Sequence, residues 1–193
     1  MSFSIPKEKN TLAIALGSNL ASPAGSPEST LISARPELER EVSNWLSSSL
    51  RKNTVIEKDS RHLRWRWSPL FETDPIGGPS NQGVYLNAVV VIDGPMLSGL
   101  KPTEKAAINL LERFLKIEKN YGRDREHTKI PWGPRSLDLD LLAWGSLHVQ
   151  SELLYLPHPR LIERNFVIVP LAEALNIHSR APRRIEGQHN WPE

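Results

Sequence analysis

Apolar residues in several parts of this chain follow the spacing of β-strands. Nearly continuous apolar runs predict buried strands over 11–16 and 85–92, and each run ends in a turn that contains Gly. Basic residues or His alternate with Leu and Trp over 61–67, which is typical of a strand with one buried side. These three segments predict part of a β-sheet.

Other segments repeat their apolar residues every three or four positions, which is the spacing of an α-helix. One predicted helix runs over 31–50, with Ser29 or Thr30 as its cap. A second runs over 102–121, and its predicted apolar face includes Leu115. Both helices follow a predicted strand, so strands and helices alternate along the chain.

The stretch 137–142 alternates Leu and Asp, which predicts a further strand with one buried face. Its Leu side chains would point into the core, and Asp138 and Asp140 would share the opposite face. Two carboxylates this close repel each other, and a cation between them removes the repulsion. Their hard oxygen atoms suit Mg²⁺, which often takes substrate phosphates as further ligands. The alternative interpretation is an exposed strand face that happens to be acidic.

The remaining segments complete an α+β pattern. A hairpin is predicted over 147–156, and a helix or pair of helical turns over 161–175. The order of elements favours helices packed on one face of a mainly antiparallel sheet, which is the split βαβ or ferredoxin-like arrangement. We expect a flexible N-terminal tail over 1–10, one domain over 11–175 and a polar surface segment over 176–193.

Composition narrows the class of protein. The chain has 193 residues, of which 39% are hydrophobic, so it is long enough for one well-packed domain and short for two. It has no cysteine, which excludes a disulfide framework, a thiolate metal site and a cysteine nucleophile. No signal peptide or transmembrane segment is apparent, so we expect a cytoplasmic enzyme or small-ligand binder. A pI near 9.0 fits a pocket that attracts a polyanionic small molecule.

Basic side chains lie on both sides of the acidic strand in the sequence. Arg123, Arg125 and Arg135 precede it, and His158 and Arg164 follow it. Each is a common surface residue when taken alone. Guanidinium groups bind phosphate oxygens bidentately, however, and Mg²⁺ bridges phosphates to carboxylates. Because the chain has no GxxxxGK[ST] loop and no kinase-type GxGxxG, any phosphates would be held by side chains and metal.

Six motifs make this pattern specific. In chain order they are Gly17-Ser18-Asn19, Thr73-Asp74-Pro75-Ile76-Gly77, Tyr85-Leu86-Asn87-Ala88, Gly122-Arg123-Asp124-Arg125, the stretch 132–142, and Pro157-His158 with Arg164-Asn165-Phe166. With these motifs the chain resembles the 6-hydroxymethyl-7,8-dihydropterin pyrophosphokinases of folate biosynthesis over about residues 13–175. The resemblance implies a ferredoxin-like fold and transfer of the β,γ-pyrophosphoryl unit of ATP to the pterin hydroxymethyl oxygen, with release of AMP. We expect a monomer that binds these small molecules rather than nucleic acid or a membrane.

The resemblance also implies roles for individual residues. Asp138 and Asp140 would hold two Mg²⁺ ions that bridge the ATP phosphates and the substrate hydroxyl. The implied ATP-binding residues are Glu118, Arg123, Arg135, His158 and Arg164, with Arg125 as a loop residue that helps closure. The implied pterin-binding residues are Thr73, Pro75, Ile76, Tyr85, Asn87, Trp132 and Phe166. Those implied to be catalytic are Arg123, Arg135, Asp138 and Asp140.

The implied pterin site is chemically reasonable. Asn87 would hydrogen-bond the pterin, Tyr85 and Phe166 would flank its ring, and Trp132 would belong to a loop that covers it. A flat ring rich in donors and acceptors suits an aromatic slot of this kind. Because a metal ion can lower the pKa of a primary alcohol, the transfer requires no dedicated protein base.

Two other functions fit parts of the sequence. A Mg²⁺-dependent nucleotide hydrolase would use the same two Asp residues to activate water. A non-catalytic, ferredoxin-like RNA-binding module would use Trp65, Trp67 and the adjacent Arg residues as a stacking and phosphate surface. For the segment 61–67, burial of its Leu and Trp side chains in a core is the simpler explanation.

Overall fold

The computed structural model describes residues 10–50, 62–125 and 131–175. In chain order the elements are β1 (Leu12–Ser18), α1 (Pro27–Leu50), β2 (Arg64–Trp67), β3 (Phe71–Thr73), β4 (Tyr85–Asp93), α2 (Pro95–Ser98), α3 (Glu104–Asn120), β5 (Asp138–Trp144), β6 (Val149–Gln150), β7 (Tyr155–Leu156) and α4 (Asn165–Ala174). The segments 1–9 and 176–193, predicted as a tail and a surface segment, lie outside the described residues. None of the described helices is long and apolar enough to span a membrane.

Five strands form one antiparallel sheet around β1. The strand order is β2-β4-β1-β5. Both β2 and β3 pair with β4: β2 pairs with residues 90–93, and β3 pairs with residues 85–87. α1 lies between β1 and β2 in the chain, and α3 lies between β4 and β5. The two strands of each pair are not hydrogen-bonded to each other, as in a split βαβ fold. The predicted α+β, ferredoxin-like class is therefore confirmed. The predicted hairpin is also present, as the separate two-stranded pair β6-β7.

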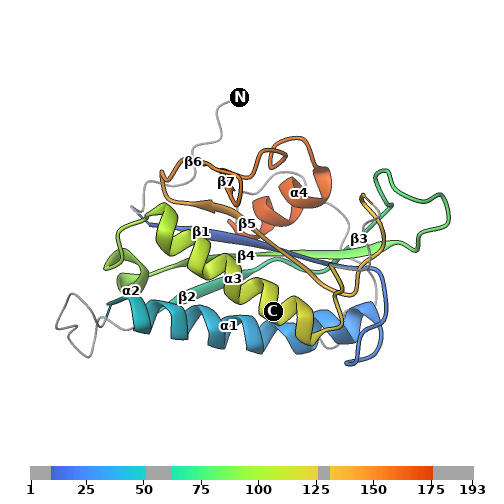
Figure 1. Cartoon of the computed structure of the whole chain (residues 1–193), viewed down its shortest axis with the longest axis horizontal. Helices are drawn as coiled ribbons and strands as arrows, with labels where there is room; N and C mark the ends of the chain where they lie inside the picture. The colour runs from blue at the N-terminus through green and yellow to red at the C-terminus, as the bar shows by residue number, and fades with distance from the viewer. Residues whose placement is uncertain (1–9, 51–61, 126–130, 176–193) are drawn as a thin grey trace.

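Helices cover both faces of the sheet (Figure 1). α1 and α3 lie on one face and enclose the main core, which includes Leu139 of β5. α4 lies on the other face, where Val167 and Leu171 pack with Val89 and Val91 of β4. The prediction of helices on a single face was wrong, because β4 presents apolar side chains to both sides and the second side also needs cover.

The first helix begins earlier than its apolar pattern indicated. The Ser26 hydroxyl accepts a hydrogen bond from the Ser29 N–H at 3.2 Å, and Pro27 occupies the first helical position. Thr30 lies buried inside the helix, with its hydroxyl bonded to the Ser26 carbonyl at 2.8 Å. The predicted caps, Ser29 and Thr30, were therefore wrong, because the cap precedes the apolar stripe by a full turn.

α3 positions both core residues and one candidate site residue. It starts after Thr103, whose side chain accepts a hydrogen bond from the Ala106 N–H. Leu115 was predicted on the buried face but is 40% exposed. Glu118 is instead buried. The buried face of the helix therefore includes the Glu118 carboxylate near its C-terminal end, and this carboxylate points toward β5.

The aromatic residues of β2 belong to the core layer. Trp65 and Trp67 are partly buried and pack against the main core. The Trp67 indole donates to Glu39 at 2.9 Å, and the Arg35 guanidinium lies 4.6 Å from its ring centroid. Both arginines of this strand pair with the buried Asp93. The stacking surface that an RNA-binding module would use here is therefore engaged in packing.

Asn10 is anchored although we placed it in the flexible tail. Its side-chain amide donates to the Ser98 carbonyl at 3.2 Å and to the Leu100 carbonyl at 3.1 Å. These bonds satisfy carbonyl groups where α2 ends. Asn10 therefore packs with the domain, one residue before the predicted domain boundary.

Candidate active site

The central strand β1 brings two predicted site residues into one row across the sheet. Gly17 pairs with Asn87 of β4 on one side and with Asp138 of β5 on the other. A Cβ atom at Gly17 would lie 3.0 Å from the Asn87 Oδ1 and 4.0 Å from the Asp138 Cβ. Glycine therefore leaves space between the amide and the carboxylate, on the sheet face opposite the main core.

Asp138 and Asp140 share that face, as the alternating pattern predicted, while Leu139 and Leu141 are buried in the main core. Burial and the negative charges of Asp138 and Glu118 raise the pKa of the Asp140 carboxyl to about 7. A cation at this position would relieve the repulsion. Two carboxylates on one strand face therefore fit a hard divalent ion.

The number of metal ligands that the protein supplies bears on which metal ion the site could bind. Among residues 10–50, 62–125 and 131–175, no group of three or more His, Asp or Glu side chains is arranged to hold an ion. A protein that supplies two carboxylates leaves the remaining positions to water and phosphate oxygens, which is typical of Mg²⁺ in phosphoryl-transfer sites.

Replacing Asp140 with Asn is expected to stabilise the ligand-free protein at neutral and alkaline pH. The folded-state pKa of about 7 exceeds the ordinary value of 3.8, so wild-type stability falls as pH rises between these values and is constant above them. Asn has a similar shape and no charge. In thermal unfolding with a chelator, the melting-temperature advantage of the variant should grow from pH 5 to pH 8. A constant difference would contradict the raised pKa.

Three guanidinium groups surround the Asp138 carboxylate. The Arg135 Nη1 lies 2.5 Å from Oδ2, and the Arg123 Nη1 lies 2.8 Å from Oδ1. The Arg125 Nη2 lies 3.7 Å from Oδ1. Arg123 also donates to the Leu137 carbonyl at 2.9 Å, which ties it to the start of β5. Two of the arginines predicted to bind phosphate, Arg123 and Arg135, and the predicted loop residue Arg125 therefore neutralise Asp138 in this structure.

Glu118 connects α3 to the backbone between the two Asp residues. Its Oε1 accepts a hydrogen bond from the Leu139 N–H at 2.9 Å, and its Oε2 accepts from the Arg125 Nε at 2.9 Å and Nη2 at 2.6 Å. Its side chain is 1% exposed, and burial together with the charge of Asp138 raises its pKa. Both oxygens are thus occupied within the protein, so the geometry supports a positioning role, and the predicted ATP contact stays a prediction.

Replacing Glu118 with Ala is expected to lower the free energy of unfolding by about 2 kcal/mol, because the buried Leu139 N–H loses its acceptor. Glu118→Gln keeps an oxygen for that N–H and should lose less. Urea unfolding measures both, with Glu112→Ala as a control at an exposed position of the same helix. Equal losses for Glu118→Ala and the control would show that the bond to β5 contributes nothing.

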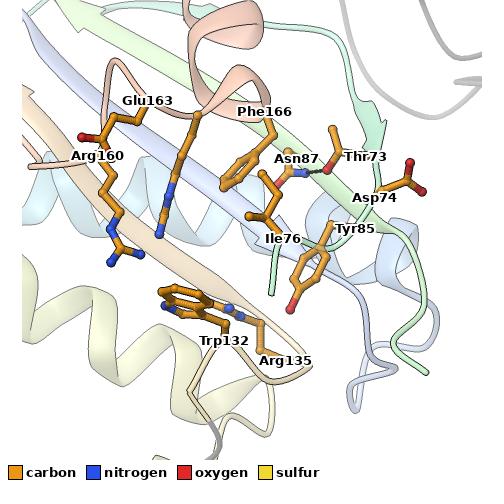
Figure 2. Close-up of a pocket in the computed structure, with 11 residues that line it drawn as sticks. Thr73, Asp74, Ile76, Tyr85, Asn87, Trp132, Arg135, Arg160, Glu163 and Phe166 are labelled. Carbon is orange, nitrogen blue, oxygen red and sulfur yellow. Dashed lines mark hydrogen bonds between the residues drawn. The ribbon is translucent and has the colours of Figure 1, made fainter. Parts of the chain in front are cut away.

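A cavity of about 290 Å³ opens on the same sheet face (Figure 2). Its lining residues are Thr73, Asp74, Ile76, Tyr85, Asn87, Trp132, Arg135, Arg160, Glu163, Arg164 and Phe166. The lining thus includes every predicted pterin-binding residue except Pro75. The Asn87 Nδ2 donates to the Thr73 hydroxyl at 2.8 Å, which fixes the orientation of the amide. Aromatic side chains and one oriented amide suit a flat ring with polar edges.

The basic residues after β7 form one wall of this cavity. The Arg164 guanidinium lies 5.3 Å from the Phe166 ring centroid, and burial and the charge of Arg160 lower its pKa. Burial and Arg164 also lower the pKa of His158, so its imidazole is neutral at pH 7. The His158 Nδ1 accepts the Arg160 N–H at 3.3 Å, which leaves Nε2 as the donor. This wall can attract and bind an anion.

A second cavity, of about 390 Å³, shares Trp132 and Arg135 with the first. It is also lined by Arg123 and Arg125. Arg135 therefore contacts both spaces as well as Asp138. Arg123, Arg125, Arg135 and Asp138 are therefore brought together, and Asp140, His158 and Arg164 interact electrostatically with groups of this cluster.

Sequence reasoning missed several residues around the site. Arg160 and Glu163 line the first cavity but were not singled out, because isolated charged residues in loops carry no distinctive pattern. Asp74 also lines it and had been noticed only as part of its motif. Asn19 accepts the Arg135 N–H at 2.7 Å through Oδ1 and donates to the Gly83 carbonyl at 3.2 Å. Asn19 belongs to the motif Gly17-Ser18-Asn19, but the sequence does not show that it holds the backbone of Arg135, because the two residues are 116 positions apart.

The geometry agrees with a comparison against known families. The family model described as 7,8-dihydro-6-hydroxymethylpterin-pyrophosphokinase matches residues 13–176. The chain belongs to this family. The resemblance drawn from the six motifs is thereby confirmed for nearly the whole of the predicted domain.

Curated relatives from bacteria and plants carry related names. The 2-amino-4-hydroxy-6-hydroxymethyldihydropteridine pyrophosphokinase of Bacillus subtilis (strain 168) is 42% identical over 106 residues, which cover 55% of this chain and 56% of that protein. The protein of the same name from Haemophilus influenzae is 39% identical over 106 residues, covering 55% and 58%. The folate synthesis bifunctional protein of Arabidopsis thaliana is 40% identical over 110 residues, covering 57% and 20%.

The chain spans about half the length of the curated bacterial pyrophosphokinases it matches. Family membership therefore supports the fold, and the location of the site and the roles of individual residues remain predictions that rest on the geometry above.

Proposed function

We propose that this chain transfers the pyrophosphoryl group of ATP to 6-hydroxymethyl-7,8-dihydropterin, giving the pterin pyrophosphate and AMP in folate biosynthesis. The observation that carries the proposal is the position of the aromatic cavity beside the acidic strand. Arg135 lines the cavity and pairs with Asp138, while Asn87 lies in one row with Asp138 across Gly17. A flat ring bound in the cavity would therefore place its substituent next to the carboxylates.

The pterin would be held by its ring faces and by one polar edge. Tyr85 and Phe166 supply aromatic surface, and Trp132 contributes an indole that is 48% exposed without ligand. The Asn87 amide donates one N–H to Thr73, which directs Oδ1 toward Gly17 and the cavity. That oxygen would accept a hydrogen bond from a ring N–H or amino group.

The phosphates would be held by arginines, His158 and the acidic strand. Asp138 and Asp140 would bind two Mg²⁺ ions, which neutralise phosphate charge and lower the pKa of a bound hydroxyl. Arg123 and Arg135 would then be released from Asp138 to bind phosphate oxygens. Arg164 and the neutral His158 would add donors from the opposite wall. Positioning and charge neutralisation are what phosphoryl transfer mainly requires.

The products formed from ATP distinguish this proposal from the hydrolase alternative. With Mg²⁺, ATP and pterin present, we expect AMP and the pterin pyrophosphate in equal amounts, and no AMP when the pterin is omitted. Chromatography of nucleotides and pterins measures both. ATP hydrolysis that is indifferent to the pterin would overturn the proposal and favour a nucleotide hydrolase.

The proposal includes a monomer that acts in the cytoplasm without a nucleic-acid or membrane partner. These parts rest on the composition and on the small size of both substrates. Light scattering across a range of protein concentrations tests the monomer, since a mass that rises with concentration would contradict it.

A further inference from the structure

Gln82 joins two loops that are far apart in the sequence. Its Nε2 donates to the Gly77 carbonyl at 3.0 Å and to the Trp132 carbonyl at 3.1 Å. Its Oε1 accepts the Tyr85 hydroxyl at 3.2 Å. Gln82 is not among the residues that line the ring cavity, whereas Tyr85 and Trp132 are. Any effect of Gln82 on a ligand there must therefore act through its neighbours.

Trp132 has a backbone conformation that needs support from such contacts. Its φ is 57°, in the left-handed region that residues with a Cβ atom rarely adopt. The hydrogen bond from Gln82 holds the carbonyl of this residue, and the Tyr85 hydroxyl lies 3.0 Å from the carbonyl of the next one, Gly133. The turn at Trp132 is thus held by Gln82, in the loop that precedes β4, and by Tyr85, the first residue of β4.

The loop around Gly77 is shaped to fit against Trp132. Gly77 and Gly78 both have a φ of 75°. A Cβ atom at Gly77 would overlap the indole ring, and one at Gly78 would overlap the Trp132 carbonyl and the Gln82 amide. On the cavity wall that includes Arg160 and Arg164, the Arg160 guanidinium lies 4.9 Å from the indole centroid, and Figure 2 shows it pointing toward the ring. The indole is therefore confined from two sides.

We propose that Gln82 is a positioning residue for the ring substrate: by tying the two loops together, it holds the Trp132 indole against the aromatic cavity. The inference deepens the proposed function and rests on it, since the ring is taken to be the pterin. Loss of the two exposed hydrogen bonds that Gln82 donates, together with the part-buried bond from Tyr85, should weaken ring binding about 10-fold. Because Gln82 acts through Trp132, that loss should depend on the indole being present.

A double-mutant cycle tests this dependence. Pterin is titrated calorimetrically, with Mg²⁺ and a non-hydrolysable ATP analogue present, into wild type, Gln82→Ala, Trp132→Ala and the double variant. We expect a Kd about 10-fold higher for Gln82→Ala in the wild-type background and no further change in the Trp132→Ala background. Gln150→Ala, at an exposed position of β6, is the matched control and should bind as wild type does.

Two further measurements separate positioning from general stability. Gln82→Glu keeps the size of the side chain but presents no donor to the two carbonyl groups, so it should weaken binding at least as much as Gln82→Ala. The melting temperatures of both variants should match that of wild type. An equal loss of affinity with and without the indole, or no loss at all, would overturn the inference.

Failure of the proposed function is distinguishable from failure of this inference. If the wild-type protein binds no pterin, the function is wrong, and acrylamide quenching of Trp132 fluorescence still tests the contact. Subtracting the signal of Trp132→Phe isolates this indole from the other tryptophans. Gln82→Ala should make Trp132 more accessible to the quencher, and unchanged quenching would contradict the positioning role.

Discussion

The Asp138→Asn and Asp140→Asn variants are expected to lose at least about 100-fold in turnover, since even residues that only support a metal ligand contribute 10- to 100-fold. Both carboxylates lie on one face of β5, beside the ring cavity, where they are the candidate metal ligands. Pterin affinity should change little, because the proposed ring contacts come from Tyr85, Asn87 and Phe166. Rates of AMP formation test the loss of turnover, and calorimetric titration tests the pterin affinity.

Asp140→Asn is the cleaner of the two variants. Asp138 also binds Arg123 and Arg135, so its loss leaves two guanidinium groups without their carboxylate. Glu152→Gln, at an exposed position, controls for the removal of one negative charge. Near-normal turnover in both Asp variants would exclude them from the metal site.

Replacing Arg135 with Ala is expected to lower kcat/KM for ATP about 100-fold, which is the size of effect seen when one preorganised donor to a transition-state charge is removed. Its guanidinium lines both cavities and contacts Asp138, and its ring contact with Tyr85 has a centroid distance of 5.5 Å. The melting temperature should change little, because this side chain lines the two cavities and does not belong to the apolar core.

Two comparison variants sharpen the Arg135 experiment. Arg135→Lys keeps the charge but loses the bidentate hydrogen bonding of the guanidinium. Its kcat/KM for ATP should therefore fall between those of wild type and Arg135→Ala. Arg40→Ala removes an arginine that is 63% exposed on α1 and should leave activity unchanged. A large fall in melting temperature with unchanged ATP kinetics would assign Arg135 to the fold rather than to the reaction.

The parts of the fold that follow a local pattern could be predicted from the sequence. The alternation of Leu and Asp over 137–142 fixes which side chains share a face, because successive residues of a strand point to opposite sides. The predicted strands over 11–16 and 85–92 became β1 and β4 for the same reason. The motifs were informative because they place particular residue types at particular spacings in these elements.

The errors concern contacts that no local pattern records. The apolar stripe of α1 did not reveal that Ser26 caps it, and the long apolar run of β4 did not reveal a helix on its second face. Glu118 was predicted as an ATP contact, and the sequence did not reveal that it is buried with its carboxylate bound by Leu139 and Arg125. Each outcome depends on which segment packs next to another, and such packing overrides local propensity.

By itself, the sequence determined the types of the main elements, the shared face of Asp138 and Asp140, and the family to which the chain is similar. Only the tertiary structure decided that Gly17 separates Asn87 from Asp138, and that Gln82 reaches Trp132. The physical reason is that periodicity acts between residues a few positions apart. The site is instead assembled by strand register and by hydrogen bonds between residues 50 or more positions apart.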